Sequence, residues 1–555
     1  MKSSDSTSIQ TEDQKKQIAV VNAIFPDRIT VTVYDLEAFR NGGETLRVGS
    51  YLRVVDAEGS ILIAMVESFT VLPGEPNSEG IVLPAYRLDG RPLGAISGGV
   101  FERGSAAIAI PPRLVEPAMY EEIRSIFERS VPADVQFRFA HLASDQTISV
   151  PVEGNRFFNK HIAVVGSTGS GKSYTVSKIL QTAVGMEAGQ SNAHVVIFDI
   201  HSEYRAAFPG ACVLDISNLA LPYWLMNGTE LQEFFLDTEG NDHNQRNVFK
   251  EGVVTGKQRC FDGTEEQRER LTLDSPVYFD IEDVLNYAIE KNEEMVPGAR
   301  GEKAGPLNGK LSNFISRLEN KLNDRRLSFL LGREARNSSF ETVLRQLLGY
   351  GEHRSNVTII DVSGVPFEVL SITVSLVSRL LFDYGYYYKR MRDRAGEAIQ
   401  NDIPVLLVFE EAHKYVPNST TARYRAARES IERIAKEGRK YGVSLMLASQ
   451  RPSEISETIF SQCNNFLALR LTNPADQNYV KRLLPDAMGS IVDSLPGLRT
   501  GECLLVGEAV VLPSIVKIDR SDAPPASNDI PYWTLWQEPW HELDIDSIKA
   551  QWMDR

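Results

Sequence analysis

With 555 residues the chain is too long for one hydrophobic core, and a content of 42% hydrophobic and 24% charged residues is typical of a globular protein of two or three domains. Its net charge of −15, from 74 acidic and 59 basic residues, argues against a protein that coats nucleic acid with a generally basic surface. Any contact with nucleic acid must therefore be local, as inside a channel.

The sequence carries no sign of export or of membrane insertion. It contains no run of about 18 apolar residues, and its polar start lacks the apolar core of a signal peptide. The cysteines lie far apart without a C-x-x-C pair, which indicates neither a zinc cluster nor a disulfide framework. We therefore expect a cytoplasmic protein with reduced cysteines and no membrane partner.

The first part of the chain predicts a small all-β domain. Residues 1–16 are polar and without periodicity, which predicts a disordered tail. Over residues 17–112, short β-rich runs alternate with turn signals such as Glu58-Gly59 and Asp89-Gly90, a spacing that predicts a β-barrel. The predicted strands are 18–24, 29–34, 51–55, 61–66, 81–83 and 100–110. A connector, 113–150, contains a predicted helix, 116–128, and a predicted strand, 135–141.

A phosphate-binding motif follows the connector. Apolar residues 162–165 lead into a segment that fits G-x-x-x-x-G-K-[ST], and a helix-permissive run, 174–183, comes next. In such a loop backbone N–H groups cradle a polyphosphate, Lys172 reaches the β- and γ-phosphates, and the Ser173 hydroxyl binds Mg²⁺. The alternative is a chance glycine-rich turn. The predicted nucleotide-binding residues are Gly166, Ser167, Thr168, Gly169, Ser170, Gly171, Lys172, Ser173 and Tyr174.

Buried strands alternate with helical stretches after this motif. The predicted strands are 194–199, 357–361, 405–409, 443–448 and 466–471. Near-continuous apolar strands separated by helices predict an α/β fold with a mostly parallel sheet covered on both faces. We expect this core to be split into residues 151–204 and 356–518, with a mainly helical insertion, 205–355, that has a flexible loop near 297–309.

Carboxylates follow one of these strands. Glu410 and Glu411 come directly after strand 405–409, at the sheet edge where α/β proteins bind ligands. Glu410 takes the position that holds Mg²⁺, directly or through water, and Glu411 the position that polarises the attacking water. The alternative is a solvated helix start with acids as dipole partners.

Other polar residues follow neighbouring strands. Asp199 could support Mg²⁺ indirectly and Glu203 could orient water or Lys172, unless both serve only as a helix cap with local hydrogen bonds. Gln450 is placed to sense the γ-phosphate or to position water, unless it only bonds to backbone at the sheet edge.

A basic helix is predicted over residues 424–441. Spacing predicts ion pairs of Glu429 with Arg433 and of Glu432 with Lys436. Arg439 has no acid four residues away on either side, so it is either an arginine finger that enters an adjacent subunit's site or an exposed arginine.

The end of the chain combines two strands with a tryptophan-rich arm. Residues 501–517 predict two strands joined through Gly507. Residues 519–555 carry Trp533, Trp536, Trp540 and Trp552 on a polar segment. Such aromatic residues often anchor a segment to a groove, either on its own subunit or on a neighbouring one.

Several blocks together resemble the HerA branch of the HerA/FtsK superfamily of hexameric DNA-translocating ATPases. In chain order they are GSTGSGKS, FDIHSEY, LLVFEEAHKYVP, IAKEGRKYGVSLMLASQRPSEI and LPGLRTGECLLVG, within residues 17–518. The resemblance implies a homo-hexamer with a RecA-like P-loop ATPase core, ATP and Mg²⁺ between subunits, and double-stranded DNA in a central channel. It also implies nucleotide and Mg²⁺ binding by Lys172 and Ser173, a catalytic acid at Glu411, a sensor at Gln450 and a trans finger at Arg439. Glu410 departs from the Asp of many P-loop ATPases.

The resemblance also implies partners. Similar proteins act with a nuclease in DNA end processing, or with sirtuin-like or nuclease effectors in anti-phage defence. We therefore expect an ATP-driven translocase of double-stranded DNA. The alternative is a nucleotide-dependent ring scaffold that assembles and controls a partner effector. A GTPase is disfavoured because the sequence lacks the guanine-reading N-K-x-D motif.

Overall fold

The structure is a computed structural model of the whole chain. It describes residues 18–40, 46–55, 59–73, 84–97, 100–104, 114–185, 191–236, 243–298, 301–351, 353–396, 402–418, 425–484, 489–527 and 530–553. The chain divides into two compact units, one of residues 1–157 with 467–519 and one of residues 158–466 with 520–555. Each unit is described separately.

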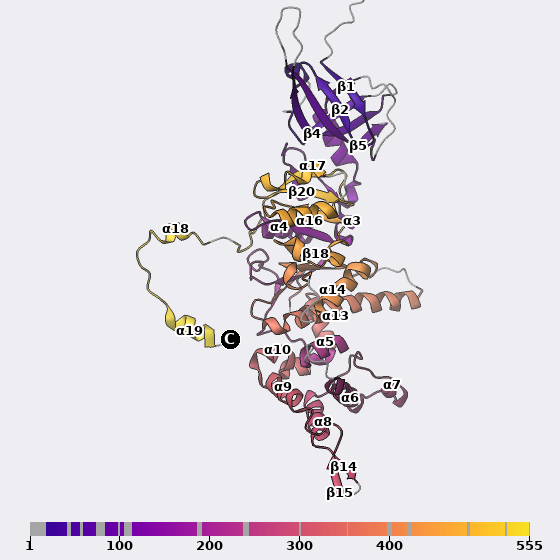
Figure 1. The fold of residues 1–555 in the computed structure, drawn as a ribbon, viewed down its shortest axis with the longest axis vertical. Coiled ribbons are helices and arrows are strands. Elements are labelled where there is room, and N and C mark those ends of the chain that lie inside the picture. The colour runs from indigo at the N-terminus through magenta and orange to yellow at the C-terminus, as the bar shows by residue number, and fades with distance from the viewer. Residues whose placement is uncertain are drawn as a thin grey trace, which may run out of the picture. The chain divides into compact units, whose positions relative to one another are not determined.

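The first unit contains a seven-stranded antiparallel sheet near the N-terminus (Figure 1). Its strands follow the order β1-β2-β5-β4-β3-β7, and β6 pairs with β5. They are β1 (Ala19–Ile24), β2 (Ile29–Val33), β3 (Tyr51–Val55), β4 (Ile61–Leu72), β5 (Ala85–Ser97), β6 (Val100–Arg103) and β7 (Leu114–Pro117). Aliphatic side chains such as Val31, Val54 and Leu62 form its core. Closure of this sheet into a barrel stays a prediction.

One strand of this sheet contradicts the sequence-based expectation. Asp89-Gly90 was expected to be a turn, but it lies inside β5, where Asp89 pairs with Thr30. The Asp89 carboxylate accepts hydrogen bonds from the Thr30 hydroxyl at 2.8 Å and from the Arg87 guanidinium at 3.1 Å. Because these bonds compensate for its partial burial, an aspartate is tolerated within the strand. The predicted strand 81–83 lies outside the described residues.

The connector also differs from the prediction. The expected helix 116–128 begins later, as α2 (Tyr120–Arg129), because Leu114–Pro117 forms β7 against β3. The expected strand 135–141 is two short strands, β8 (Gln136–Phe137) and β9 (Ala140–Leu142). β9 pairs with β21 (Ser514–Ile518), which pairs with β20 (Glu502–Gly507). The two predicted C-terminal strands are thus present in this unit.

The second unit contains six parallel strands in the order β13-β16-β12-β17-β18-β11. They are β11 (Ile162–Val165), β12 (His194–Asp199), β13 (Cys212–Leu214), β16 (Val357–Asp361), β17 (Val405–Phe409) and β18 (Val443–Ser449). Residues of β11, β12, β17 and β18 are buried throughout, as expected for strands covered on both faces. The predicted α/β class is confirmed.

Helices surround this sheet. α4 (Lys172–Val184) follows the phosphate loop, and α14 (Arg425–Glu437) packs against the long helix α13 (Phe367–Arg394) (Figure 1). Residues 205–355, expected to be a mainly helical insertion, also contain β13, which pairs with β16 in the parallel sheet. The helices in this range are α5 (Gly228–Phe235), α6 (His243–Cys260), α7 (Glu265–Glu269), α8 (Ile281–Glu293), α9 (Ser312–Asn323), α10 (Ser328–Leu331), α11 (Arg333–Asn337) and α12 (Phe340–Leu347). Where a loop was expected near residues 297–309, the structure has a hairpin of β14 (Met295–Gly298) and β15 (Gly301–Ala304).

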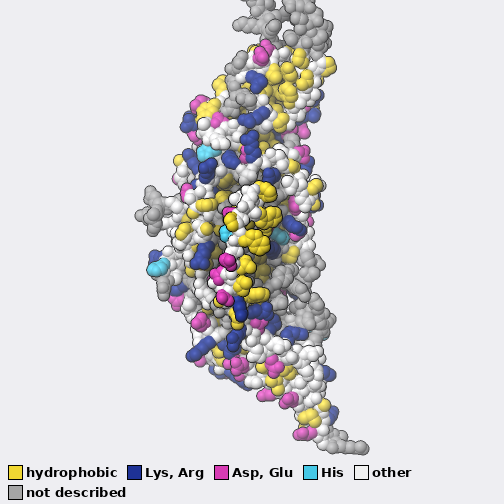
Figure 2. Space-filling model, turned by 90° about the vertical axis from the view of Figure 1, so that its left-hand side faces the viewer, with side chains coloured by type: hydrophobic (Ala, Val, Ile, Leu, Met, Phe, Trp, Pro, Cys, Tyr) yellow, Lys and Arg dark blue, Asp and Glu magenta, His cyan; other side chains and the backbone are white. Residues whose placement is uncertain are grey.

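The C-terminal arm is held at its root and exposed beyond it. The Gln181 side chain on α4 donates a hydrogen bond to the Ala523 carbonyl at 2.7 Å and accepts one from the Ser521 hydroxyl at 2.8 Å. Further along are α18 (Tyr532–Leu535) and α19 (Ile545–Met553). Trp533, Trp536, Trp540 and Trp552 are each more than 70% exposed. Figure 2 shows hydrophobic side chains uncovered on the face it presents.

Within the described residues, no helix has the length and apolar character needed to cross a membrane.

Candidate nucleotide site

The phosphate loop lies at the carboxyl edge of the parallel sheet. It leaves β11 beside the end of β18, where the Gly166 N–H donates to the Ser449 carbonyl at 3.2 Å. Gly169 and Gly171 have φ angles of 71° and 101°, a left-handed backbone that glycine adopts readily. α4 begins at Lys172 directly after this turn, so the positive end of its dipole faces the loop.

Lys172 points toward acids that follow the neighbouring strands. Its ammonium nitrogen lies 4.0 Å from Oε1 of Glu411, and its side chain is 10% exposed. Burial lowers the pKa of Lys172, while the nearby carboxylates, foremost that of Glu411, act in the opposite direction. The predicted lysine and the predicted catalytic acid are therefore neighbours.

Glu411 is held in an unusual conformation by surrounding side chains. Its φ of 47° and ψ of 51° are left-handed, a conformation that is uncommon for residues other than glycine and is often found at functional sites. Oε1 accepts a hydrogen bond from the Gln450 amide at 2.6 Å, and Oε2 lies 3.3 Å from Nδ1 of His413. Gln450 in turn accepts a hydrogen bond from the Thr168 hydroxyl at 2.5 Å. Gln450 thus bonds to side chains of the site, rather than only to backbone.

His413 and Ser449 also belong to this edge of the sheet, although no role was predicted for either residue from the sequence. Nδ1 of His413 lies 3.2 Å from the Ser449 hydroxyl, and the same nitrogen faces Glu411. Burial lowers the pKa of His413, while Glu411 acts in the opposite direction. The sequence offered one indication of this role, because His413 lies only two residues after Glu411. The contact of His413 with Ser449, however, depends on the pairing of β17 with β18.

The remaining acids form a buried group beside this one. Asp199 is fully buried and accepts hydrogen bonds from the backbone N–H groups of His201, Glu203 and Tyr204 at 2.9–3.2 Å. These hydrogen bonds cap the turn that follows β12, which matches the local capping role predicted for Asp199 as the alternative to support of Mg²⁺. Burial, together with the nearby carboxylates of Asp199 and Glu203, raises the pKa of Glu410 to about 9.

The donors at this edge suit Mg²⁺. Oε2 of Glu410 and Oε2 of Glu203 are buried without a hydrogen-bond partner among the described residues, and Ser173 lies in the first turn of α4. The described residues contain no group of three or more His, Cys, Asp or Glu side chains able to cage a metal. Mg²⁺ in a phosphate loop needs no such cage, since it keeps water and phosphate oxygens as ligands.

Arg439 lies at the opposite edge of the sheet from these residues. It belongs to a 3-10 turn, η6 (Gly438–Lys440), that precedes β18, whereas Gln450 follows the same strand. The seven residues of β18 span about 20 Å at roughly 3.3 Å per residue. Arg439 is exposed, and no described residue forms an ion pair with it. The structure therefore does not bring Arg439 to the phosphate loop of its own chain.

Of the two ion pairs predicted for the basic helix, one is present and the prediction of the other is wrong. Lys436 pairs with Glu432 at 3.3 Å, as expected. Glu429 pairs instead with Arg425 at 2.8 Å, on the preceding turn of α14. Arg433 lies 3.5 Å from Asp383 of α13 and stacks on the Phe382 ring, a contact between helices that spacing within one helix cannot predict.

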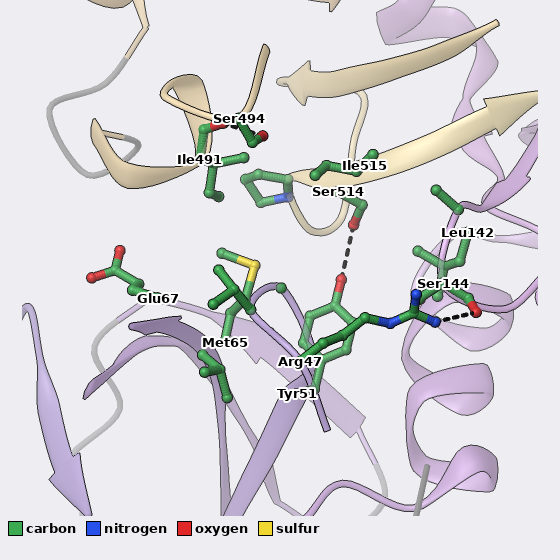
Figure 3. Close-up of a pocket in the computed structure, with 15 residues that line it drawn as sticks. Arg47, Tyr51, Met65, Glu67, Leu142, Ser144, Ile491, Ser494, Ser514 and Ile515 are labelled. Atoms are coloured by element: carbon green, nitrogen blue, oxygen red, sulfur yellow. Dashed lines mark hydrogen bonds between the residues drawn. The ribbon is translucent and has the colours of Figure 1, made fainter. Parts of the chain in front are cut away.

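The first unit contains a separate pocket of about 200 Å³ (Figure 3). Met65, Ile491 and Ile515 contribute apolar walls. The Tyr51 hydroxyl lies within hydrogen-bond distance of the Ser514 hydroxyl, at 3.1 Å, which ties β3 to β21. Arg47 donates to the Ser144 carbonyl at 3.0 Å. The lining lacks the convergent acids and glycine-rich loop of the nucleotide site.

Comparison with known proteins yields a consistent set of similarities. Residues 137–381 match the family described as helicase HerA, central domain. A probable helicase of Methanocaldococcus jannaschii is 26% identical over 417 residues, which cover 74% of this chain and 73% of the relative. The DNA double-strand break repair helicase HerA of Sulfurisphaera tokodaii is 27% identical over 446 residues, or 79% of each chain. The HerA helicase of Sulfolobus acidocaldarius is 28% identical over 410 residues, which cover 71% of this chain and 72% of the relative. Among solved structures, the plasmid coupling protein TrwB with a non-hydrolysable ATP analogue is 11% identical, covers 73% of this chain and 94% of that chain, and has a TM-score of 0.44.

Proposed function

We propose that this chain is a HerA-like ATPase of the HerA/FtsK superfamily that hydrolyses ATP in a homo-hexameric ring to move double-stranded DNA through a central channel. The single observation that carries this proposal is the position of two groups on one sheet. Glu411 and Gln450 meet the phosphate loop at the carboxyl edge, while the exposed Arg439 lies at the amino edge. The names of the relatives, DNA double-strand break repair helicases, support DNA as the substrate.

The chain's residues divide the work of hydrolysis in this proposal. Backbone N–H groups of residues 166–173 and the Lys172 ammonium bind the phosphates. Ser173 and Glu410 would hold Mg²⁺, directly or through water, and the bound ion would supply positive charge that neutralises the phosphates. Glu411 orients the attacking water and accepts its proton, because it is the acid nearest Lys172. Gln450 holds Glu411 and senses the γ-phosphate through Thr168.

Arg439 completes the site of the adjacent subunit. A delocalised cation stabilises the charge that develops on the transferred phosphoryl group. Because Arg439 is exposed at the far edge of its own sheet, it supplies this cation to a neighbour, with ATP bound between subunits. The parallel sheet then acts as a RecA-like core, and the N-terminal sheet as a closed barrel that helps assemble the ring.

The proposed motor is tested by ATP hydrolysis with and without duplex DNA, together with displacement of a protein roadblock from that DNA. We expect duplex DNA to stimulate hydrolysis and the wild-type protein to displace the roadblock. Lys172→Ala and Glu411→Gln should abolish both, whereas a control substitution of an exposed helical lysine, Lys250→Met, should abolish neither. Roadblock displacement by Glu411→Gln at the wild-type rate would contradict the assignment.

We further propose that the ring works with a partner, either a nuclease or a sirtuin-like effector, in DNA end processing or anti-phage defence. The double-strand break repair names of the relatives support end processing. Copurification from the native host should recover an enzyme with one of these activities. Recovery of the ring without such a partner would argue against this part of the proposal.

A second candidate function is a ring scaffold that assembles and controls an effector with little translocation. The exposed tryptophans of the arm favour it, because large uncovered aromatic side chains commonly mark interaction surfaces. The test removes residues 530–555 and keeps residues 521–526, which bond to α4 and to the Glu203 carbonyl. If the protein is a scaffold, removal of the arm should abolish binding of the partner but leave DNA-stimulated ATP hydrolysis unchanged. Unchanged assembly and unchanged partner binding would refute the role of the arm.

A further inference from the structure

A buried histidine connects the strand of the phosphate loop to the turn that carries Arg439. His161 immediately precedes β11, at the opposite end of this strand from the phosphate loop, and is 2% exposed. Its Nε2 lies 3.0 Å from the carbonyl oxygen of Ala435 in α14. Its Nδ1 accepts a hydrogen bond from the Leu445 N–H in β18 at 3.1 Å. One imidazole thus bonds to both sides of the α14–β18 connection.

The bonding pattern allows only one form of this imidazole. Because the Leu445 N–H donates to Nδ1, the proton of a neutral ring must lie on Nε2, which donates to the Ala435 carbonyl. Burial, with a smaller contribution from the positive charge of Arg439, outweighs the hydrogen bond to the Ala435 carbonyl and lowers the pKa of His161 to about 4. The ring is therefore neutral near pH 7, with both nitrogens engaged.

The segment that His161 spans has little room to move. A Cβ at Gly438 would lie 2.4 Å from the Val443 carbonyl oxygen, so the two ends of the turn are in close approach. The Gly442 carbonyl accepts from the Val405 N–H at 2.8 Å, and the Tyr441 ring packs edge-on against Phe382. Arg439 and Lys440 are the exposed side chains of this closely held turn.

His161 itself has a left-handed backbone, with a φ of 54°. A residue other than glycine in this region carries a strain of roughly 1–3 kcal/mol, which persists only where the surroundings hold it in place. The two imidazole bonds supply that support. The conformation and the contacts of His161 thus favour a defined position for the turn.

We propose that His161 is a positioning residue for Arg439, so that the strand leading into the phosphate loop of one subunit also sets the arginine which that subunit gives to its neighbour. This inference rests on the proposed trans role of Arg439. It assigns His161 to the neighbour's catalytic step, although His161 immediately precedes the strand that leads to its own subunit's phosphate loop.

Mixed rings test this inference because they separate the two sites that one subunit serves. Subunits with Lys172→Ala lack a working loop but keep Arg439, and subunits with Arg439→Ala keep the loop. His161→Asn is then added to one kind of subunit at a time. Asparagine tolerates the left-handed backbone, but its side chain is too short to bond to both Ala435 and Leu445. ATP hydrolysis of the mixture is measured against the same mixture without the added change.

The expected result is asymmetric. His161→Asn in the Lys172→Ala subunit should lower the mixed-ring rate roughly tenfold, since small misplacement of a catalytic group has effects of this order or more. The same change in the Arg439→Ala subunit should lower it by less than about twofold. Equal losses from both placements, or a larger loss from the second, would overturn the inference.

Controls separate folding failure from loss of positioning. His194 is the matched control, since it is a buried histidine that begins another strand of the same parallel sheet, β12, and bonds to the Leu348 carbonyl. His194→Asn in the Lys172→Ala subunit should leave the mixed-ring rate unchanged. The thermal midpoint and nucleotide affinity of each variant are measured alongside. If the parent mixture of Lys172→Ala and Arg439→Ala shows no restored hydrolysis, the trans role of Arg439 fails and the inference fails with it.

Discussion

The side-chain amide of Gln450 joins the phosphate loop to Glu411. Its nitrogen donates to the Glu411 carboxylate at 2.6 Å, and its oxygen accepts from the Thr168 hydroxyl at 2.5 Å. A ligand that moves Thr168 therefore acts on Glu411 through one side chain. This connection gives the site a direct means to sense the nucleotide.

Gln450→Ala should lower the turnover of ATP by tenfold or more, by analogy with the loss of other groups that position a general base. The affinity for nucleotide should change little, because the phosphates are held by the loop and Lys172. Steady-state hydrolysis and titration with a fluorescent nucleotide measure the two quantities. Thr168→Val is the matched variant, because it removes only the hydrogen bond between Thr168 and Gln450. If Thr168→Val lowered turnover more than Gln450→Ala, Thr168 could not act on Glu411 mainly through Gln450.

Glu411→Gln should lower turnover by about 10²–10⁴-fold while nucleotide still binds, because the amide cannot accept a proton. Lys172→Ala should instead weaken nucleotide binding. The pair of variants separates chemistry from binding when both are measured by single-turnover hydrolysis and equilibrium titration. Wild-type turnover by Glu411→Gln would show that another group accepts the proton.

Much of the nucleotide edge could be predicted from the sequence because its parts follow strands that are themselves recognisable. β12, β16 and β17 have the predicted bounds, since each is a largely apolar run that ends at an acidic residue or directly before one. In a parallel sheet, residues that follow adjacent strands meet at one edge. The proximity of Lys172, Glu411 and Gln450 follows from this rule, whereas their catalytic roles stay predictions.

The features that were not predicted from the sequence depend on contacts between segments far apart in the chain. The strand β5 was missed because Asp89-Gly90 looks like a turn, and only the partner Thr30 shows why an aspartate is stable there. The contact of Arg433 with Asp383 and the two bonds of His161 join segments far apart in the chain. Such contacts depend on which strands and helices are neighbours, and local spacing holds no information about that.

Arg379→Met should destabilise the second unit by about 3–5 kcal/mol, because it leaves a buried carboxylate without its partner. The Arg379 guanidinium donates to Glu230 at 2.9–3.2 Å and to the Leu225 carbonyl, and Glu230 is fully buried. Urea unfolding measures the effect. The double variant Glu230→Gln/Arg379→Met should recover part of the loss, and equal destabilisation of the single and double variants would refute this cause.

Lys257 should make stability rise with pH on the alkaline side. Its ammonium donates to the carbonyls of Leu273 and Ser275 at 2.6 Å, and burial lowers its pKa from 10.5 to about 8, with Asp274 and Arg379 as the charged neighbours. Between these two values the unfolded chain binds more protons than the folded one, so the free energy of unfolding increases with pH. Relative to Lys257→Met, the wild type should gain about 1–2 kcal/mol between pH 8 and 9.5.

Urea unfolding of both proteins across this pH range checks the Lys257 prediction. Lys250→Met, which changes an exposed lysine on the same helix, should show the same pH dependence as the wild type. A wild-type stability that falls with pH relative to Lys257→Met would contradict the direction of the shift.

If one catalytic site is built from two subunits, a mixture of Lys172→Ala and Arg439→Ala proteins should hydrolyse ATP even though neither variant has a complete site of its own. In a random ring of equal parts, about a quarter of the interfaces pair an intact loop with an intact arginine. The mixture should hydrolyse ATP well above the sum of the rates of the two variants measured separately. A rate no higher than that sum would contradict a catalytic site built from two subunits.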